Sequence, residues 1–435
     1  MSERSSGLIL PRQHGVTAPG ALDDWRKPVG ANPAFMFLSH ASRVLMLQGP
    51  VGPFFDRMCG WLKSRGAEVR RVVFQGGDEF DCQALQPERF TAPPAEWPAH
   101  FSALVSDWKP DCIVLFGQAR HYHKVALERA RAIDLPVVVL EEGYFRPGYV
   151  TMELGGVNGY STTLDRFEWT VGPTDADAGL RPDTSEMHFQ KMAWHACQHY
   201  LALGRTKKTF PHYQHHRCDD VQFYARYWVW SWFRKYWHRQ PDYRLQRWLI
   251  GEPGHPQPYF FVPLQLEGDS QITYHSPFTN IVEFIIQVMR SFAARAPRDS
   301  LLVFRQHPHA RGGPGHVDLI RTLATSLGVA NRVHHMAEGD TPILAEHSMG
   351  TVVINSTVGL QALERGVPLI ALGEALYRQP EFTFTGALDD FWDKRLPPDA
   401  AVTAAFLAQI KNLTQAPASV YALRKEKLRW TVPPR

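Results

Sequence analysis

Short apolar runs that end in a glycine- or proline-containing turn, each followed by a helical pattern, recur through this chain. The first run, Arg43–Leu47, ends in Gln48-Gly-Pro-Val-Gly-Pro53 and is followed by a helical pattern over 54–63 and a second strand over 68–75. Strand, turn, helix and strand make a βαβ unit, whose parallel strands are covered on both faces and read as continuous apolar runs. The same pattern returns over 111–117, 123–133 and 136–140. We therefore expect an α/β fold.

A second series of the same kind begins near Pro258. Its expected strands are 259–266, 301–305, 332–336, 351–355 and 368–372, with helices around 279–294, 315–328, 341–348 and 357–365. A chain of 435 residues suits two domains better than one core. The two series predict two Rossmann-like domains that face each other across a cleft, because such sheets bind ligands beyond the carboxyl ends of their strands.

The segment between the two series differs from both in composition. Between 205 and 247 Lys and Arg are frequent and Asp occurs only at 219, 220 and 242, while Tyr227-Trp-Val-Trp-Ser-Trp-Phe233 and Trp237 are set among the basic residues. This mixture suits the headgroup layer of an anionic membrane; a helix that packs its aromatics on the sheet domains is the alternative. The expected parts are a polar arm over 1–40, Rossmann-like domains over 41–190 and 256–410, a basic, Trp-rich helical linker over 191–255, and a tail over 411–435, free to pack back on the first domain.

Composition also bounds the partners and the compartment. The net charge of +4 is too small to argue for nucleic acid. The five cysteines form no C-x-x-C pair, which is typical of reduced thiols in the cytosol. We find no signal peptide and no run of roughly 18 apolar residues, the length that a membrane span requires. The expected location is the cytoplasm.

Two acids follow an apolar strand in Leu140-Glu-Glu-Gly143. There they project into the expected cleft, where a carboxylate can act as general acid or base toward a sugar hydroxyl; an acidic strand end that caps the next helix is the alternative. A second strand ends in Arg305-Gln-His-Pro308. Arg305 and His307 offer donors that stabilise a leaving phosphate, and Pro308 stops the strand so that the imidazole stays at its rim.

Two further segments of the second domain suit a nucleotide sugar. Asn355-Ser-Thr357 precedes a helical pattern, and donors at a helix N-terminus bind phosphate. Glu364, further along that helix, could accept from ribose hydroxyls; a capped helix with a surface Glu is the alternative. Asp269 follows the first strand of this domain and could serve as nucleophile or charge stabiliser, or cap the next helix. The Cys and His spacings complete no tetrahedral set, so no metal is expected.

With these segments placed, the chain resembles the capsular polysaccharide synthesis KpsS/LipB family, the β-Kdo transferases of Gram-negative bacteria. The resemblance runs in order from about 45 to 395. The matching segments are 47–55, 74–78, 141–144 with Arg146 and Pro147, 155–159, 213–217, 263–265, 269–271, 307–308, 355–357, 368–373 and 391–392.

The resemblance implies a GT-B fold and transfer of Kdo from CMP-β-Kdo without a metal or other cofactor. The acceptor would be an anionic, phosphatidylglycerol-type lipid at the inner leaflet, starting the poly-Kdo linker that carries the capsule chain. Related β-Kdo transferases retain configuration through an aspartyl-sugar intermediate, and Asp269 matches that position. Glu142 is then the first choice for acid/base catalysis, with Glu141 close behind.

The resemblance also suggests binding roles and partners. The nucleotide and phosphate would be held by Arg305, His307, Pro308, Asn355, Ser356, Thr357 and Glu364, and the acceptor by Gln48, Gly49, Arg146, His215, His216 and Arg217. The protein would lie on the inner face of the inner membrane and meet other capsule assembly proteins. Two alternatives stay open. One is an inverting transferase of another CMP-sugar, because the Glu-Glu-Gly and His-Pro motifs are also similar to bacterial sialyltransferases. The other is a non-catalytic export component that binds the lipid-linked polymer.

Overall fold

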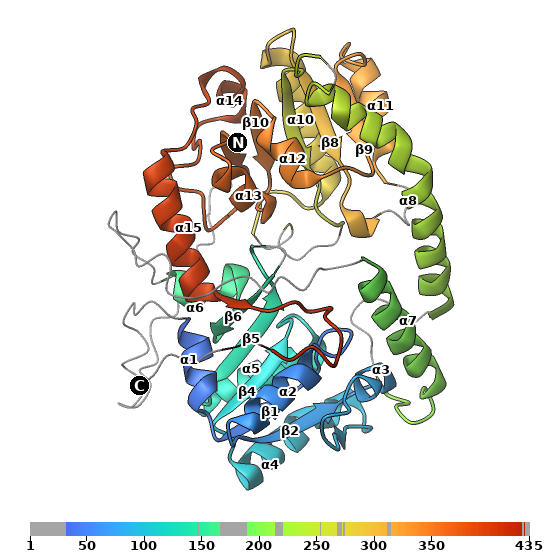
Figure 1. Ribbon diagram of the computed structural model, residues 1–435, viewed down its shortest axis with the longest axis vertical. Coiled ribbons are helices and arrows are strands. Elements are labelled where there is room, and N and C mark those ends of the chain that lie inside the picture. The colour runs from blue at the N-terminus through green and yellow to red at the C-terminus, as the bar shows by residue number, and fades with distance from the viewer. Residues whose placement is uncertain are drawn as a thin grey trace, which may run out of the picture.

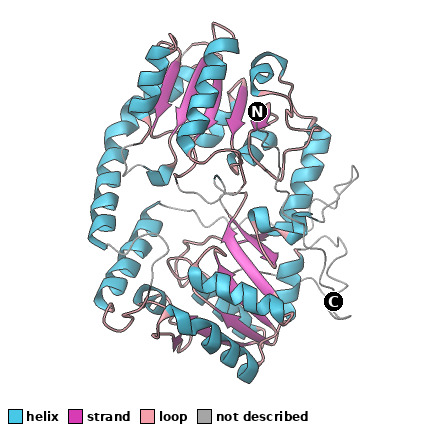
Figure 2. Cartoon of the chain, turned by 180° about the vertical axis from the view of Figure 1, so that it is seen from behind, coloured by secondary structure: helices cyan, strands magenta, loops and turns pink. Residues whose placement is uncertain are grey.

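The chain folds around two β-sheets that lie at opposite ends of the molecule (Figures 1 and 2). The computed structural model describes residues 32–145, 148–165, 189–213, 221–252, 254–267, 272, 275–310, 315–428 and 430. The strand order is β12-β6-β5-β4-β1-β2-β3 in the first sheet and β11-β10-β7-β8-β9 in the second. Helices cover both faces of each sheet, as Figure 2 shows. The predicted α/β class with two Rossmann-like domains, the GT-B arrangement, is therefore confirmed.

The first sheet is parallel except at one edge. Its strands β3, β2, β1, β4 and β5 run in parallel, whereas β6 pairs antiparallel with β5, and β12 antiparallel with β6. The strands are β1 Arg43–Met46, β2 Glu68–Val73, β3 Glu88–Arg89, β4 Cys112–Phe116, β5 Val137–Glu142, β6 Tyr149–Leu154 and β12 Gln415–Pro417. The helices are α1 Pro33–His40, α2 Phe54–Ser64, α3 Gly76–Phe80, α4 Trp97–Trp108, α5 His121–Ala132 and α6 Thr162–Asp165.

The apolar spacing of α2 shows why these segments become helices against a sheet. Phe54, Phe55, Met58, Trp61 and Leu62 are all buried and recur at helical spacing, so they form one stripe that faces the strands. The same cluster contains alternate residues of β1, β4 and β5. The helix begins directly after Pro53, where the missing N–H costs no helical hydrogen bond.

The second sheet is entirely parallel among the strands that the structure describes. Its strands are β7 Tyr259–Pro263, β8 Leu301–Arg305, β9 Val333–Met336, β10 Gly350–Val353 and β11 Leu369–Ala371. Its helices are α10 Ile281–Arg295, α11 Val317–Ser326, α12 Thr341–Glu346, α13 Val358–Glu364 and α14 Leu388–Lys394. The carboxyl ends of these strands therefore share one edge of the sheet, where the residues predicted to bind the nucleotide begin.

Two connections join the sheets. The basic segment forms α7 Phe189–Arg205 and α8 Val221–Leu249, which run along one side of the molecule (Figure 1). On the other side, α15 Ala400–Thr414 returns from the second domain and leads into β12 at the edge of the first sheet. Within the described segments, no helix combines the length and apolarity needed to cross a membrane.

The expectation of a loose arm over 1–40 is wrong for its last residues. Pro33–His40 form α1, in which Phe35 and Leu38 are buried in the core of the first domain. Asn32 caps this helix, because its side chain accepts from Phe35 N and donates to Met152 O. Asn before Pro at the first helical position is a recognised start signal that the short periodicity of this segment concealed. Residues 1–31 lie outside the described part.

Candidate active site

Glu141 and Glu142 end β5 and point to opposite faces of the first sheet, because successive strand side chains alternate. Glu141 Oε2 accepts a hydrogen bond from Asn158 Nδ2 at 2.8 Å. Glu142 Oε1 instead accepts from the hydroxyl of Tyr421, in the C-terminal tail, at 3.0 Å. Both carboxylates are only half-buried. The two neighbouring acids therefore lie in different surroundings.

The turn that carries Asn158 connects Glu141 to a second, deeper acid. Asn158 has a φ of 56°, a left-handed conformation that Asn tolerates better than most residues. Its N–H donates to the Tyr144 hydroxyl at 3.0 Å, and that hydroxyl donates to Glu153 Oε1 at 3.3 Å. A continuous chain of hydrogen bonds thus leads from Glu141 through Asn158 and Tyr144 to Glu153.

Glu153 is a buried acid that sequence reasoning missed. It lies in β6 with 1% of its surface exposed and also accepts a hydrogen bond from Ser161 Oγ. Burial raises the pKa of Glu153 to about 8, and the nearby Glu141 carboxylate acts in the same direction. The available signal was one Glu within the apolar run Tyr149–Leu154, which is costly to bury without partners.

Glu153→Gln is expected to alter the pH dependence of stability. Because the folded carboxyl has a pKa near 8, the folded protein binds more protons than the unfolded chain between the ordinary Glu range and about pH 8. Wild-type stability should therefore fall as pH rises through that window. The amide does not ionise, so the melting temperature of the variant relative to wild type should increase from pH 5 to pH 9.

Thermal unfolding at pH 5, 7 and 9 measures this effect. The exposed Glu96, changed to Gln, is the matched control and should leave the wild-type slope unchanged. Parallel pH profiles for wild type and Glu153→Gln would show that Glu153 does not titrate as its burial implies.

In the second domain, Asn355 is held at the carboxyl ends of the adjacent strands β7 and β10. Gln265 Nε2 donates to Asn355 Oδ1 at 3.0 Å, and Asn355 Nδ2 donates to the carbonyl of His275 at 3.2 Å. The next residue, Ser356, accepts from the N–H of Val358 through its hydroxyl at 3.3 Å. The predicted Asn355–Thr357 segment therefore lies directly before α13, with Asn355 oriented by two residues that were not predicted as site residues.

We call the Glu141 neighbourhood of the first domain and the Asn355 neighbourhood of the second domain the two half-sites. An aromatic contact joins them. The ring of Tyr160, in the turn that begins with Asn158, contacts the ring of His275 edge-on with centroids 5.6 Å apart. Asn158 binds Glu141, and the His275 carbonyl binds Asn355. The acidic strand end of the first domain and the polar strand ends of the second are thus connected by direct contacts.

A shared apolar cluster holds the two domains beside this contact. Tyr144, Phe145 and Tyr149 of the first domain pack with residues of β10, α13 and α15, among them Leu360 and Phe406. Tyr144 belongs both to this cluster and to the hydrogen-bond chain to Glu153. The position of the Glu141 neighbourhood is therefore tied to the packing between the domains.

Arg305 and His307 lie where the sequence predicted, at and just after the end of β8. The Arg305 guanidinium is buried and donates to main-chain carbonyls, through Nη2 to Gly339 at 3.1 Å and through Nη1 to Gln306 at 3.1 Å. His307 is half-buried and precedes the short helical turn Pro308–Ala310. In this arrangement Arg305 positions the loop after β9, and its phosphate contact stays a prediction.

Glu364 lies away from the Asn355 segment. It ends α13, about 10 Å along the helix axis from Thr357 at 1.5 Å per residue. Its carboxylate is 3.8 Å from Lys411 Nζ on α15 and 4.0 Å from Arg365 Nη1. These contacts make Glu364 part of the contact between α13 and α15; its predicted ribose contact has no support from them.

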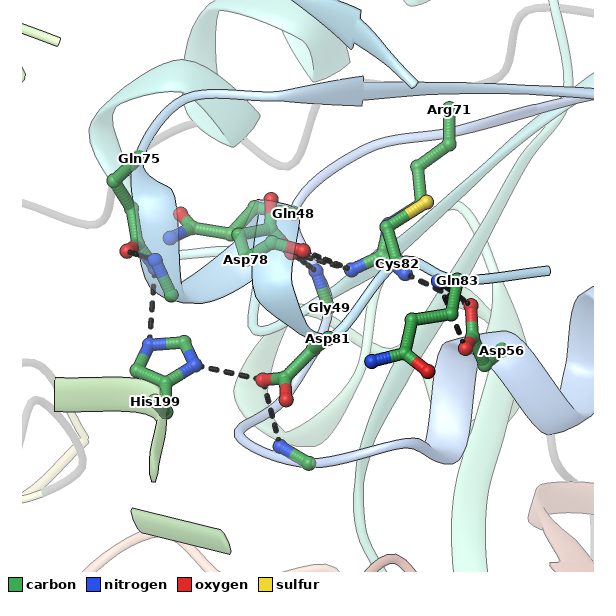
Figure 3. A network of polar contacts seen from close by, with 12 residues as sticks. Gln48, Gly49, Asp56, Arg71, Gln75, Asp78, Asp81, Cys82, Gln83 and His199 are labelled. Carbon is green, nitrogen blue, oxygen red and sulfur yellow. Dashed lines mark hydrogen bonds and ion pairs between the residues drawn. The ribbon is translucent and has the colours of Figure 1, made fainter. Parts of the chain in front are cut away.

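The predicted acceptor residues Gln48 and Gly49 lie in the turn after β1. Gln48 Nε2 donates to the Tyr213 hydroxyl at 3.1 Å, and Gly49 N donates to Asp78 Oδ1 at 3.3 Å. Asp78 also pairs with Arg71 at 2.5 Å, and both side chains are almost fully buried (Figure 3). A buried ion pair thus positions this turn.

The same network fastens the linker helix α7 to the first domain. His199 of α7 contacts Asp81 Oδ2 through Nδ1 at 2.7 Å and Gln75 through Nε2 at 3.0 Å (Figure 3). The Gly76-Gly77 pair allows this approach, because a Cβ on Gly77 would lie 2.6 Å from His199 and one on Gly76 would overlap Thr206. The Phe74–Asp78 motif therefore forms the surface on which α7 packs.

Several predicted site residues lie outside the described part of the chain. They are Asp269, Arg146, His215, His216 and Arg217. On either side of Asp269 in the sequence, Gln265 and His275 both contact Asn355. The role of Asp269 stays a prediction.

The two parallel-stranded domains and their strand order define a class, the GT-B-type α/β proteins, in which ligands bind at the carboxyl ends of the strands. The family model for capsule polysaccharide biosynthesis proteins matches residues 111–421. The chain is 34% identical to the capsule polysaccharide export protein KpsS of Escherichia coli, over 89% of this chain and 99% of that protein. This chain belongs to the capsule polysaccharide biosynthesis protein family.

A second relative agrees with that assignment. The capsule polysaccharide modification protein LipB of Neisseria meningitidis serogroup B is 30% identical, over 88% of this chain and 93% of that protein. Among solved structures, the β-Kdo 2,7 transferase of Thermosulfurimonas dismutans KpsC matches at 12% identity and a TM-score of 0.39, covering 87% of this chain and 96% of that one. A TM-score this low adds nothing to the fold assignment, which follows from the strand order.

Proposed function

We propose that this chain is a retaining β-Kdo transferase that moves Kdo from CMP-β-Kdo to a phosphatidylglycerol-type lipid, without a metal, to start a poly-Kdo linker. The observation that carries the proposal is the contact between Tyr160 and His275, which brings the Glu141 neighbourhood together with the Asn355 neighbourhood. A transferase needs an acid/base group close to the binding site of the donor phosphate. Membership of the capsule family supports a role in capsule polysaccharide biosynthesis, in which the proposed transfer would take part.

Retention requires two displacements at the anomeric carbon. In the first, the Asp269 carboxylate attacks that carbon and the bond to the CMP phosphate breaks, so that CMP leaves with the bonding electron pair. In the second, the lipid hydroxyl attacks, its proton passes to a carboxylate of the enzyme, and the bond to Asp269 breaks. Each displacement inverts the anomeric carbon, so the two together leave Asp269 free and give the product the configuration of the donor.

The geometry favours Glu141 over Glu142 as the acid/base group. Glu141 is bound to Asn158 in the turn whose Tyr160 contacts the second domain, whereas Glu142 is bound to Tyr421 in the C-terminal tail. A half-buried carboxylate at a strand end is the kind of group that serves as general acid or base. On the donor side, His307 follows the end of β8, and Ser356 and Thr357 follow the end of β10. A donor phosphate bound at these strand ends would lie beside them.

The test is incubation of the full-length protein with CMP-Kdo and a fluorescent lysophosphatidylglycerol. A slower-migrating lipid product with β-linked Kdo by NMR is expected. Asp269→Ala should abolish product formation while the circular dichroism spectrum stays that of wild type. Absence of product from the wild-type protein, with CMP-Kdo shown to be intact, would reject the proposal.

The same experiments distinguish the two alternatives, an inverting CMP-sugar transferase and a non-catalytic export component. An α-linked product, or turnover of a different CMP-sugar, would indicate an inverting transferase. Absence of any CMP binding in a titration of intrinsic Trp fluorescence, with lipid-linked polymer bound, would indicate an export component. Glu141, His307 and Ser356 would then have no catalytic role.

A further inference from the structure

Helix α8 exposes a row of large aromatic side chains. Trp230, Phe233 and Trp237 are 54%, 55% and 81% exposed. Their spacing of three and four residues places them on one face of the helix. Later on the same face, Trp248 is 43% exposed and its ring packs edge-on against His334 of the second domain, so the exposed row ends before it. We call Trp230, Phe233 and Trp237 the aromatic stripe.

The other side of α8 is already occupied by the second domain. Leu249 is fully buried, and Asp242 Oδ2 accepts from the backbone N–H groups of Ala337 and Glu338 at 2.9 and 2.8 Å. The Gln246 side chain accepts from Asp340 N at 2.8 Å. The C-terminal part of the helix is therefore anchored by Asp242, Gln246 and Leu249, while the stripe residues keep more than half of their surface exposed. In Figure 1, α8 forms the outer edge of the molecule.

The charge around the stripe is positive. Arg234 lies with its guanidinium 5.7 Å from the ring centre of Trp230, and Arg239, Arg244 and Arg247 are exposed on the same helix. The sole acid in the sequence of α8 is Asp242, whose side chain is buried against backbone N–H groups. Just beyond the end of the helix, Glu252 lies 3.8 Å from Arg247. The sequence of α8 itself therefore carries a clear excess of basic over acidic residues.

We propose that the aromatic stripe and its arginines dock on a lipid bilayer surface that contains anionic lipids. Trp and Phe rings lower their exposure by entering the headgroup layer, and each arginine is attracted by lipid phosphates. A second copy of this chain is a poor occupant, because a symmetric dimer would place two arginine-rich helices face to face. This surface exists whether or not the chain transfers Kdo, and it would hold the enzyme beside a lipid acceptor.

The test is co-sedimentation of the full-length protein with vesicles. Phosphatidylcholine vesicles containing phosphatidylserine supply negative charge without the proposed acceptor, and pure phosphatidylcholine vesicles are the neutral comparison. Binding is expected only to the anionic vesicles, and it should weaken at high salt because exposed charges are screened. The combined change Trp230→Ser, Phe233→Ser and Trp237→Ser should lower the vesicle affinity at least about tenfold, since the buried apolar area is lost.

Arginine variants separate charge from aromatic insertion. Arg234→Gln and Arg244→Gln should each weaken binding to anionic vesicles about fivefold, the equivalent of about 1 kcal/mol per basic residue near such a surface. Two exposed side chains serve as matched controls: Tyr243→Ser lies on α8 outside the stripe, and Leu396→Ser lies in the second domain. Both should bind as wild type does.

Three results would overturn the proposal: wild-type affinity in the triple variant, equal binding to neutral vesicles, or a dimer in light scattering that the triple variant converts to monomer. The last result would assign the stripe to contact between copies. A wild-type protein that binds vesicles but makes no product would reject the proposed function alone. Turnover of a detergent-dispersed acceptor by the triple variant would show that its site is intact.

Discussion

Glu141→Gln is expected to lower kcat for Kdo transfer by about 10²- to 10⁴-fold, the usual contribution of a general acid or base. The amide keeps the shape of the side chain and a contact to Asn158, but it cannot take the proton of the acceptor hydroxyl. Glu142→Gln is the matched comparison one residue away. Because Glu142 is bound to Tyr421 on the other face of the sheet, its change should cost less than about tenfold. Steady-state rates with CMP-Kdo and lysophosphatidylglycerol measure both variants.

Asn158→Ala tests whether Glu141 acts from its observed position. The variant removes the 2.8 Å hydrogen bond to Glu141 but leaves the carboxylate, so kcat should fall by less than in Glu141→Gln. Its pH–rate profile should shift, because the carboxylate has lost a donor that favours its charged form. The reverse ranking, with Glu142→Gln nearly inactive and Glu141→Gln close to wild type, would return the role to Glu142.

Arg71→Met is expected to destabilise the first domain by about 3 to 5 kcal/mol, the range for breaking a buried ion pair from one side. Arg71 is 2% exposed, and its guanidinium faces both Asp78 and Asp56 (Figure 3). Burial raises the pKa of Asp78, and the Arg71 guanidinium opposes that rise. Methionine leaves Asp78 buried without its cation. Urea denaturation followed by circular dichroism measures the loss.

The neighbouring Arg70 gives a matched control. Arg70 is exposed and stacks 4.8 Å from the ring centre of Trp108, so Arg70→Met should cost no more than about 1 kcal/mol. Adding Asp78→Asn to Arg71→Met should recover part of the lost stability, since the uncompensated charge is then removed. Equal urea midpoints for Arg70→Met and Arg71→Met would show that the buried pair contributes nothing.

The sheets could be predicted because buried parallel strands have a local signature. The run over 301–305 has the bounds that the structure gives β8, and Arg43–Leu47 differs from β1 by one residue. By contrast, β6 and β12 were not predicted. Both pair antiparallel at the sheet edge, and β12 comes from a tail more than 250 residues away in sequence, a pairing that no local pattern records.

The candidate site likewise contains residues that the sequence could predict and residues that it could not. Strand-end motifs such as Glu141-Glu142 and Asn355–Thr357 could be read locally, because chemistry at the ends of parallel strands follows directly from the strand pattern. Glu153, Asn158 and His275 could not, since each owes its place to hydrogen bonds between strands and turns that residue periodicity does not record. A buried carboxyl is tolerated only where donors converge on it, and those of Glu153 come from Tyr144 and Ser161.

The amino-acid order alone specified the α/β class, two repeated series of βαβ units and the basic aromatic character of α8. These properties depend on residue spacing within about 20 positions, where periodicity and turn chemistry act. The folded chain alone showed that Glu141 and Glu142 face different surroundings, that Arg305 is bound by main-chain carbonyls, and that Trp230, Phe233 and Trp237 are left exposed. Each depends on which distant segments pack together, and side-chain alternation or helical spacing does not say which face the rest of the protein will cover.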